Sequence, residues 1–297
     1  MAKAENIGYH LMATAVGIVW GVTFVSSKLL ILAGMQPAEI MTLRFLLAYL
    51  CLLPFSLSEK RARRLFASSL KDELLLVLLG VSGGSLYFLL ENYALVYTQA
   101  SNVSILIATT PLWTMLVSAL FLKDGSVTPR TVLFSLVSLV GVVVVVLNGR
   151  MELHLHPLGD LLTLGAALTW VLYSMILKAI EGRYPVVFIT RKLFFYGILT
   201  MLPFFAFHPW GTTWAMLGQA PVLTNLIFLG IVASFLGYIG WNLAQSRLGP
   251  VAMNLYLFIN PIATAVVAVP VLGEQFTWVT AAGTVLILGG MYLVMKE

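Results

Sequence analysis

Ten long apolar segments follow one another along this chain, and they restrict its possible folds more than any other feature. They cover approximately residues 9–32, 37–57, 73–97, 100–122, 129–148, 157–180, 185–207, 222–246, 250–272 and 276–295. An α-helix needs about 20 apolar residues to cross the hydrocarbon core of a bilayer. Several connections are very short, so the helices that they join must be antiparallel neighbours. The sequence therefore predicts an all-α polytopic membrane protein with ten transmembrane helices.

The composition agrees with a membrane protein and excludes a soluble one. Hydrophobic residues make up 60% of the 297 residues and charged residues 10%, whereas about 25% of the residues of soluble domains are charged. So little charge cannot cover a surface that faces water. The net charge of +5 does not indicate a nucleic-acid partner, because Lys and Arg gather in short loops rather than over one face.

The distribution of Lys and Arg predicts the orientation. Loop cations fall on one side of the membrane if the first helix begins in the cytoplasm; they are Lys60, Arg61, Arg63, Arg64, Lys71, Lys123, Arg130, Lys178, Arg183 and Arg247. The opposite side has Arg150 as its one clear loop cation, and its segment 208–221 contains Trp210 and Trp214 but no Lys or Arg. Positive loops face the cytoplasm and Trp lies at interfaces. We therefore expect a multi-pass protein of the inner (cytoplasmic) membrane with both termini in the cytoplasm.

An internal repeat divides the chain into residues 1–150 and 151–297. At a constant offset of 150 positions, polar, aromatic and proline residues of the first half match the second half; Trp20, Lys28, Asn92, Pro111 and Asp124 fall on Trp170, Lys178, Asn242, Pro261 and Glu274. Each half has five predicted helices, an odd number, so the second half enters the membrane from the opposite side. Transporters with inverted repeats bind substrate near the bilayer midplane, between the halves.

Several loose motifs follow one another in both halves. In the first half they are Trp20-Gly21 and Lys28, Pro37 and Arg44, Tyr93 to Thr98, Ala108 to Pro111, Lys123-Asp124 and Gly141; in the second half they are Trp170, Pro185, Asn242 to Ala244, Asn260-Pro261 and Leu272 to Glu274. Their order and spacing resemble the EamA family of the drug/metabolite transporter superfamily. The resemblance implies a transporter that exports amino acids or related metabolites, driven by proton antiport or by the substrate gradient. Two positions depart from the pattern. Glu91 meets Trp241 in the second half, and Asp124 stands where the family has glutamate.

Charged side chains within the predicted spans are the first candidates for function, because they are costly in a bilayer. Glu91 can carry a proton, bind an ammonium group or form a structural ion pair. Arg44 can bind a carboxylate or pair with Glu91 or Glu39. Lys28 has the same options or extends to the interface. For Arg191 and Lys192, extension to the cytoplasmic interface is the simpler explanation.

Polar and aromatic residues at helical spacing predict a substrate cavity with aromatic walls. The further candidates for substrate binding or coupling are Trp20, Thr23, Tyr87, Trp170, Ser174, Tyr238, Trp241, Asn254, Tyr256 and Asn260. For any one of them, ordinary helix packing is the better explanation; for the set as a whole, a cavity is favoured. Pro111 and Pro261 disrupt helical hydrogen bonding, and each is expected to form either a hinge or a static bend.

Sequence motifs typical of nucleotide-binding, metal-binding and catalytic sites are the next feature to consider. No Walker A, HExxH or CxxC motif occurs, and Cys51 is the single cysteine, so we expect no enzyme, cofactor or metal site. His154, His156 and Asp160 form a weak cluster that we expect to be solvated; an integral-membrane lipid or isoprenoid enzyme would have to use it. The expected partners are a small-molecule substrate, protons as a candidate coupling ion and the lipid bilayer, for a monomer or homodimer. Uptake of a similar solute stays open as the alternative to export.

Overall fold

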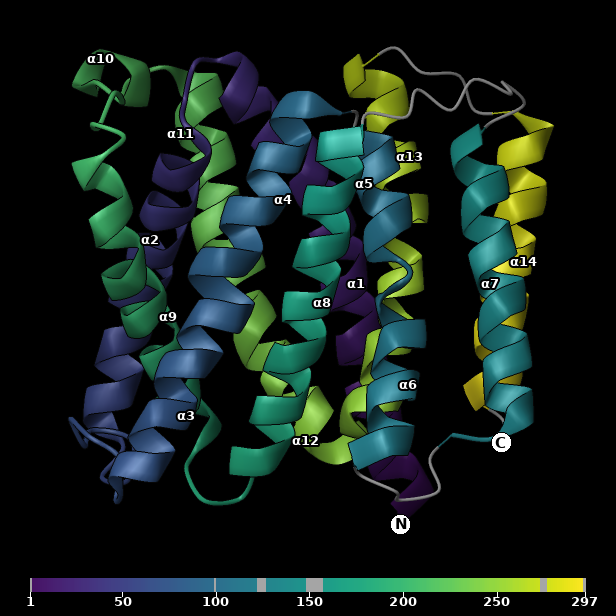
Figure 1. Cartoon of the computed structure of the whole chain (residues 1–297), viewed down its shortest axis with the longest axis horizontal. Helices are drawn as coiled ribbons and strands as arrows, with labels where there is room; N and C mark the ends of the chain where they lie inside the picture. The colour runs from purple at the N-terminus through teal and green to yellow at the C-terminus, as the bar shows by residue number, and fades with distance from the viewer. Residues whose placement is uncertain (1, 99, 122–126, 148–156, 273–276, 296–297) are drawn as a thin grey trace.

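The computed structural model describes residues 2–98, 100–121, 127–147, 157–272 and 277–295. Every regular element in these ranges is helical, and the longer helices run roughly along one direction as a bundle (Figure 1). Lys123, Asp124, Arg150, His154, His156 and Glu274, which the sequence analysis singled out, lie outside the described residues.

In the first half, two long helices are followed by three interrupted or shorter ones. The elements are α1 (Ala2–Leu32), α2 (Pro37–Ser58), α3 (Leu70–Gly80), η1 (Val81–Ser85), α4 (Leu86–Tyr97), α5 (Ala100–Ile107), α6 (Thr110–Phe121) and α7 (Pro129–Leu147). The short turn between α1 and α2 contains Gly34 at φ 93°, a conformation that glycine adopts without strain. Ser69 caps α3, because its hydroxyl accepts a hydrogen bond from the Asp72 backbone N–H at 3.1 Å.

The second half follows a similar order of elements, with the short segments η2, α10 and η4 in addition. Its elements are α8 (Pro157–Ile180), α9 (Val186–Met201), η2 (Leu202–Ala206), α10 (Trp214–Leu217), α11 (Ala220–Ile227), η3 (Phe228–Leu236), α12 (Gly237–Leu255), η4 (Tyr256–Ile259), α13 (Asn260–Leu272) and α14 (Trp278–Met295). Gly249, at φ 80° with Pro250 next to it, interrupts α12. The chain reverses direction there, so α12 is two helical segments.

Six helical segments of the described residues are long and apolar enough to cross a membrane. They are Ile7–Leu32, Pro37–Ser58, Leu70–Tyr97, Pro157–Ile180, Val186–Ala206 and Ala220–Val267. Three shorter apolar helices accompany them, Thr110–Phe121, Pro129–Val144 and Ala281–Val294. Large hydrophobic side chains such as Leu50, Leu161 and Leu288 are exposed on the outside of the bundle, as a surface that faces lipid requires.

Helix breaks occur at matching places in the two halves. The α6 helix begins at Thr110 and α13 begins at Asn260, and the π-helical segments η1 and η3 also overlap at the offset of 150. The α1 and α8 helices, which match each other, run in opposite directions, and the start of α1 and the end of α14 lie at the same end of the bundle (Figure 1). The bundle thus contains two similar halves of opposite direction.

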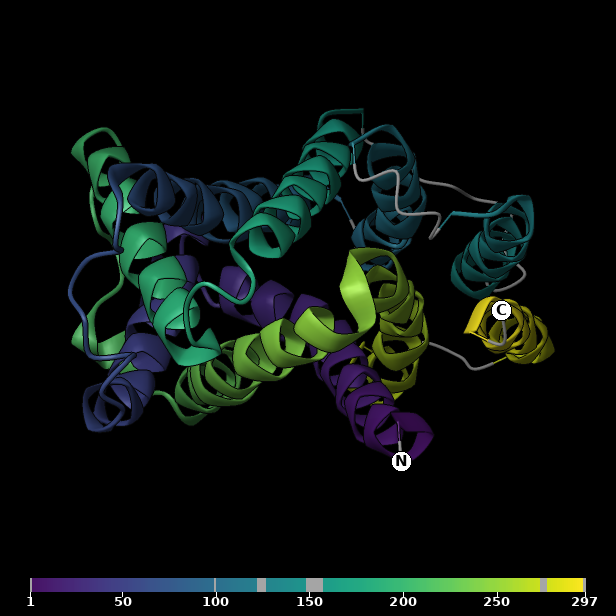
Figure 2. The ribbon, with the colours of Figure 1, turned by 90° about the horizontal axis from the view of Figure 1, so that it is seen from below.

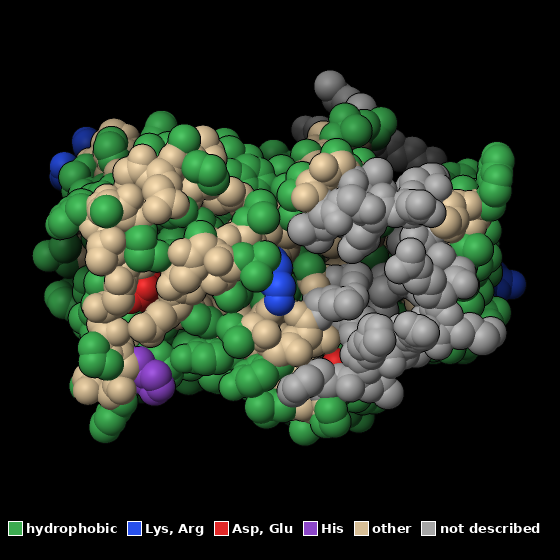
Figure 3. Space-filling view, turned by 90° about the horizontal axis from the view of Figure 1, so that it is seen from above, with side chains coloured by type: hydrophobic (Ala, Val, Ile, Leu, Met, Phe, Trp, Pro, Cys, Tyr) green, Lys and Arg blue, Asp and Glu red, His purple; other side chains and the backbone are tan. Residues whose placement is uncertain are grey.

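The centre and the edge of the bundle differ in packing. The α7 and α14 helices form a pair at one edge (Figures 1 and 2). They approach closely at glycines: a Cβ atom on Gly141 would lie 2.7 Å from the Gly283 carbonyl oxygen. The other helices surround a core of buried aromatic side chains. The end of the bundle that is uppermost in Figure 1 shows mainly hydrophobic and uncharged side chains on its described surface (Figure 3).

Candidate functional site

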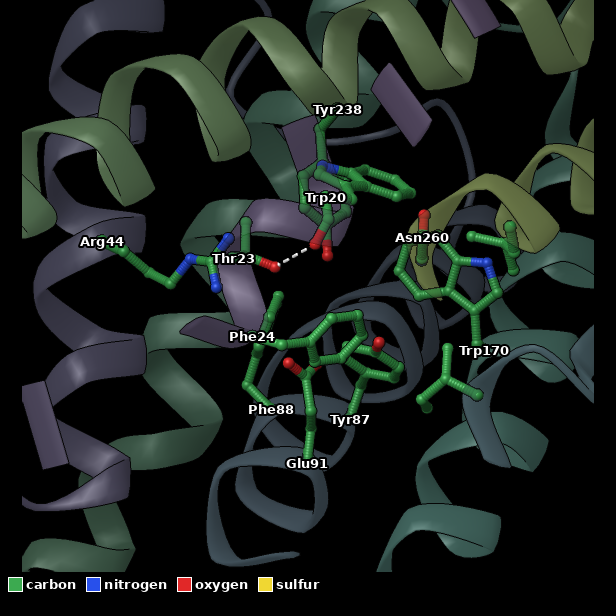
Figure 4. A pocket seen from close by; sticks show the side chains of 12 residues that line it. Trp20, Thr23, Phe24, Arg44, Tyr87, Phe88, Glu91, Trp170, Tyr238 and Asn260 are labelled. Carbon is green, nitrogen blue, oxygen red and sulfur yellow. Dashed lines mark hydrogen bonds between the residues drawn. The ribbon is translucent and has the colours of Figure 1, made fainter. Parts of the chain in front are cut away.

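A cavity lies in the core between the two halves (Figure 4). All the space between the atoms of its lining, including the part open to solvent, totals about 380 Å³. Residues from α1, α2, α4, α5, α8, α12, η4 and α13 line it; they are Trp20, Thr23, Phe24, Arg44, Tyr87, Phe88, Glu91, Ile107, Trp170, Tyr238, Leu257 and Asn260. Eight of the twelve binding candidates from the sequence therefore face one space.

The lining repeats across the two halves. Three pairs of lining residues are separated by 150 positions: Trp20 and Trp170, Phe88 and Tyr238, and Ile107 and Leu257. Matching positions of an inverted repeat meet only near the axis that relates the halves. The cavity therefore lies near the axis that relates the two halves.

Arg44 supplies the positive charge of the cavity from α2. Its side chain is 1% exposed. Nε donates a hydrogen bond to the Ser234 hydroxyl at 2.9 Å, and the guanidinium carbon lies 4.3 Å from the centre of the Phe88 ring. Nη1 has no hydrogen-bond partner among the described residues. A buried guanidinium normally satisfies its donors, so this N–H group is available to a ligand or to water.

Glu91 supplies the negative charge from α4. Its side chain is 2% exposed, and Oε1 has no hydrogen-bond partner within the described ranges. Tyr87 lies beside the carboxyl group, one helical turn earlier on the same face of α4. Of the ion pairs in the described part of the chain, none joins Glu91 to Arg44. The two opposite charges face the same cavity without neutralising each other directly.

Aromatic rings form much of the cavity wall. The Trp20 and Trp170 rings meet edge to face with their centres 5.1 Å apart, and Tyr87 lies 5.0 Å from Trp170. Behind them, Trp241 stacks on Trp20 at 4.6 Å. Such walls exclude water and offer π faces to an apolar or cationic group.

Four of the predicted site residues do not line the cavity. Trp241 packs behind Trp20 and donates to Gln245 Oε1 at 3.2 Å. Asn254 lies behind Trp170: its Oδ1 accepts from the indole N–H at 3.1 Å, and its Nδ2 donates to the Ser174 hydroxyl at 3.1 Å. Asn254 and Ser174 therefore position the wall.

The fourth, Tyr256, turns away from the centre, and its hydroxyl forms a hydrogen bond of 2.5 Å with His10 Nδ1. Asn260 does reach the cavity, and its Oδ1 has no hydrogen-bond partner in the part of the chain that the structure describes. Pro111 and Pro261 each occupy the second residue of a helix, in α6 and α13, where the missing N–H costs little. The helix breaks precede both prolines.

Four lining residues were not predicted from the sequence: Phe24, Phe88, Ile107 and Leu257. All four are apolar, so nothing distinguishes them from residues that face lipid. The repeat did contain a signal for Phe88, because its mate at the offset of 150 is the candidate Tyr238.

Two other charged groups within the spans, Lys28 and Glu39, have structural contacts. Lys28 Nζ donates to the Leu95 carbonyl at 2.5 Å, at the end of α4, and so does not pair with Glu91. Glu39 accepts hydrogen bonds from the backbone of Gly211 and from the N–H and hydroxyl of Thr212. It fastens the connection after α9 to α2, and neither Arg44 nor Lys28 reaches it.

The expectation that Arg191 and Lys192 extend to the interface is wrong. Both side chains are buried. Arg191 donates to the Ser56 hydroxyl at 2.6 Å, and Lys192 forms an ion pair of 2.5 Å with Glu73. These contacts join α9 to α2 and α3, because partners within the protein replace the water that an extended side chain would reach.

The described residues contain no group of three His, Cys, Asp or Glu side chains that could hold a metal ion. The site therefore consists of one guanidinium, one carboxyl group, hydroxyl and amide groups and aromatic walls. It can bind a small polar molecule that carries both charges.

Comparisons with known proteins identify the family. The model of the EamA-like transporter family matches residues 7–147 and again residues 157–296. An "Uncharacterized transporter" of Archaeoglobus fulgidus is 27% identical over 294 residues, which cover 98% of this chain and 99% of that protein. A "Probable terminal-alkyne amino-acid exporter" of Streptantibioticus cattleyicolor is 26% identical over 229 residues, 76% of this chain and 74% of that protein.

A solved crystal structure shows the same fold. It superposes with a TM-score of 0.78 at 16% sequence identity and covers 97% of this chain and 96% of that chain.

Proposed function

The chain belongs to the EamA-like transporter family, and we propose that it is a secondary active transporter that exports amino acids or related small metabolites across the inner membrane. Transport occurs by alternating access, with the central cavity exposed to each side of the membrane in turn. Uptake of the same class of solute is the alternative. The Streptantibioticus cattleyicolor relative is named a probable amino-acid exporter, and this similarity favours export.

The observation that carries this proposal is the separation of two opposite buried charges across one cavity. An unpaired charge in the core of a membrane protein is costly, so a ligand that satisfies both charges gains binding energy. An amino acid zwitterion has this chemistry. Its carboxylate accepts hydrogen bonds from Arg44, its ammonium group donates to Glu91, and the aromatic wall covers its side chain.

The carboxyl group of Glu91 has a second role in this proposal. When the substrate leaves, a proton can replace the ammonium group at Glu91, because one carboxylate cannot hold both. Substrate and proton then compete for one site, which is the minimal requirement for antiport. Protons are thus the proposed coupling ion, and the protein is active as a monomer or a homodimer.

The proposed topology has ten spans in two inverted halves, with both termini in the cytoplasm. The break at Gly249 divides the long segment Ala220–Val267 into two antiparallel helices. The connections α2–α3 and α8–α9, which carry Arg61 and Arg183, lie at the end of the bundle where both chain ends lie (Figure 1). This agreement with the positive-inside rule supports the orientation.

Counterflow in proteoliposomes tests the function. The purified protein is loaded with one unlabelled amino acid at a time, and accumulation of the labelled amino acid is measured against protein-free liposomes. We expect counterflow with at least one amino acid and none with its decarboxylated or deaminated analogue. If neither amino acids nor related zwitterions show counterflow, the proposed substrate class is wrong. A growth screen with toxic amino acid analogues then gives the direction, because overexpression of an exporter protects cells and overexpression of an uptake system sensitises them.

A further inference from the structure

Two backbone carbonyl groups at matching positions of the repeat bind side chains of the cavity wall. The Gly83 carbonyl in η1 accepts a hydrogen bond from the Tyr238 hydroxyl at 2.5 Å. The Ala233 carbonyl in η3, 150 positions later, accepts one from Trp20 Nε1 at 2.9 Å. Both segments are π-helical, and such turns depart from the i to i+4 hydrogen-bond pattern and often occur at functional sites. The two carbonyls are equivalent acceptors in the two halves.

The matched tryptophans use different acceptors. Trp20 donates to the Ala233 carbonyl, so the symmetric acceptor for Trp170 is the Gly83 carbonyl. In this structure Tyr238 binds that carbonyl, and Trp170 donates to Asn254 Oδ1 at 3.1 Å. Trp20 and Trp170 occupy equivalent positions of the two repeats, yet one indole donates to a backbone carbonyl and the other to an asparagine side chain.

We propose that Trp20 and Trp170 exchange these two arrangements when the transporter changes conformation. In the alternate conformation Trp170 donates to the Gly83 carbonyl, and Trp20 donates to the hydroxyl of Ser104, the residue that matches Asn254 at the offset of 150. Ser104 is buried in α5. This inference rests on the proposed function, because it takes the halves to be inverted repeats that exchange roles during alternating access.

The contact between the two indoles makes the exchange concerted. Their rings meet edge to face at 5.1 Å, and both line the cavity. In a closely packed core, one ring cannot turn without displacing the other. The cavity therefore has two discrete wall arrangements rather than a continuum.

Substrate binding favours one of these arrangements. Trp20 now stacks on Trp241 at 4.6 Å, and the residue that matches Trp241 is Glu91. After the exchange, Trp170 occupies the equivalent place beside Glu91. An ammonium group held by Glu91 then also contacts an indole face, which adds a cation–π interaction. A ligand shifts a conformational equilibrium only through such a difference in affinity, so the substrate itself promotes the exchange.

Tyr238 holds the present arrangement. Its hydroxyl donates to the Gly83 carbonyl that Trp170 uses in the alternate conformation and so competes with Trp170 for that acceptor. Its repeat mate Phe88 has no hydroxyl to stabilise the alternate arrangement in the same way. Tyr238→Phe should therefore favour the alternate conformation. Phe88→Tyr, which offers a donor to the Ala233 carbonyl, should do the same, and Ser104→Ala should favour the present one. One hydrogen bond corresponds to a population change of roughly fivefold.

Sided thiol labelling tests the exchange. Ile107→Cys, in a Cys51→Ser background, places a reporter in the cavity. An impermeant thiol reagent is applied to right-side-out and to inside-out vesicles, and the ratio of the two labelling rates is measured. We expect Tyr238→Phe and Phe88→Tyr to move this ratio in one direction and Ser104→Ala to move it in the other, each by roughly fivefold. Leu257→Cys, the repeat mate, should report the same directions.

Counterflow by the same proteins separates the two proposals. If the unmodified chain shows no counterflow with any zwitterion, the proposed function fails. If counterflow is present but Tyr238→Phe and Ser104→Ala move the ratio in the same direction or leave it unchanged, the exchange is wrong. Phe88→Tyr decides the case if Tyr238→Phe is not recovered as folded protein, because it adds a hydroxyl instead of removing one.

Discussion

Arg44 Nη1 and Glu91 Oε1 both face the central cavity, and neither has a hydrogen-bond partner among the described residues. The two side chains come from different helices, α2 and α4, so helix packing fixes their separation. Structural ion pairs elsewhere in this chain, such as Lys192 with Glu73, are in direct contact. Arg44 and Glu91 make no such direct contact, and this difference is what the proposed role in binding a zwitterion explains.

The guanidinium fork of Arg44 should be required for binding. Arg44→Lys keeps the positive charge but loses the second N–H group and the stacking on Phe88. We expect Arg44→Gln to weaken substrate binding by about 2 kcal/mol or more, roughly thirtyfold, and Arg44→Lys to recover only part of that loss. Isothermal titration in detergent measures both. Arg247→Gln, far along α12, is the matched control and should bind normally; equal binding by all three variants would rule out a role for Arg44.

Coupling to protons should depend on Glu91. Glu91→Gln keeps the shape of the side chain but cannot exchange a proton, so we expect it to lose flux driven by a pH gradient. Substrate exchange should remain measurable at saturating substrate, with weaker binding because the amide no longer pairs with the ammonium group. Proteoliposomes with and without an imposed gradient compare the two activities. Glu181→Gln, at the surface next to Lys178, is the control. Flux through Glu91→Gln that still responds fully to the gradient would exclude a proton site at Glu91.

The two ends of the bundle should face opposite sides of the membrane. Arg61 lies in the α2–α3 connection and Thr213 precedes α10, and these segments are at opposite ends of the bundle (Figure 1). In a Cys51→Ser background, we expect cysteine at position 61 to react from the cytoplasmic side and cysteine at position 213 from the external side. Labelling of both from one side would refute the proposed topology.

Close packing of α7 and α14 should contribute to stability. A Cβ atom on Gly290 would lie 2.6 Å from the Phe134 carbonyl oxygen and would collide with the Ser138 hydroxyl, whereas on Gly289 it would meet nothing within 4 Å. We expect Gly290→Ala to lower the melting temperature and Gly289→Ala to leave it unchanged or raise it slightly, since alanine favours a helix by about 0.5–1 kcal/mol over glycine. A fluorescence melting curve in detergent compares them; equal melting temperatures would contradict the packing.

Much of the site could be predicted from the sequence, because polar residues stand out in apolar helices. Glu91 and Arg44 were recognisable by charge alone, and Trp20 and Trp170 by their common offset of 150. The apolar members of the wall could not be predicted, since Ile107 and Leu257 resemble any residue that faces lipid. Their positions depend on how the helices pack, which periodicity does not determine.

The hydrogen-bond partners of the polar residues could not be predicted from the sequence either. Asn254 and Ser174 share a polar stripe with cavity residues, yet they bind each other and Trp170 behind the wall. Lys192 looked like an interfacial side chain because Glu73 is far away in the sequence, 119 positions earlier. The π-helical segments also escaped prediction. In η1, Gly83 packs directly against the Tyr173 ring, a contact between two distant parts of the chain that periodicity does not reveal.

The most direct test of the account is a comparison of three ligands with three forms of the protein. The ligands are the best amino acid from counterflow, its decarboxylated amine and its deaminated acid; the proteins are the unmodified chain, Glu91→Gln and Arg44→Gln. We predict that the unmodified chain prefers the amino acid, that Glu91→Gln loses the preference for the amino acid over the acid, and that Arg44→Gln loses the preference over the amine. If the unmodified chain binds all three ligands equally, or if both variants weaken all three ligands by the same factor, the two charges do not bind the two ends of a zwitterion.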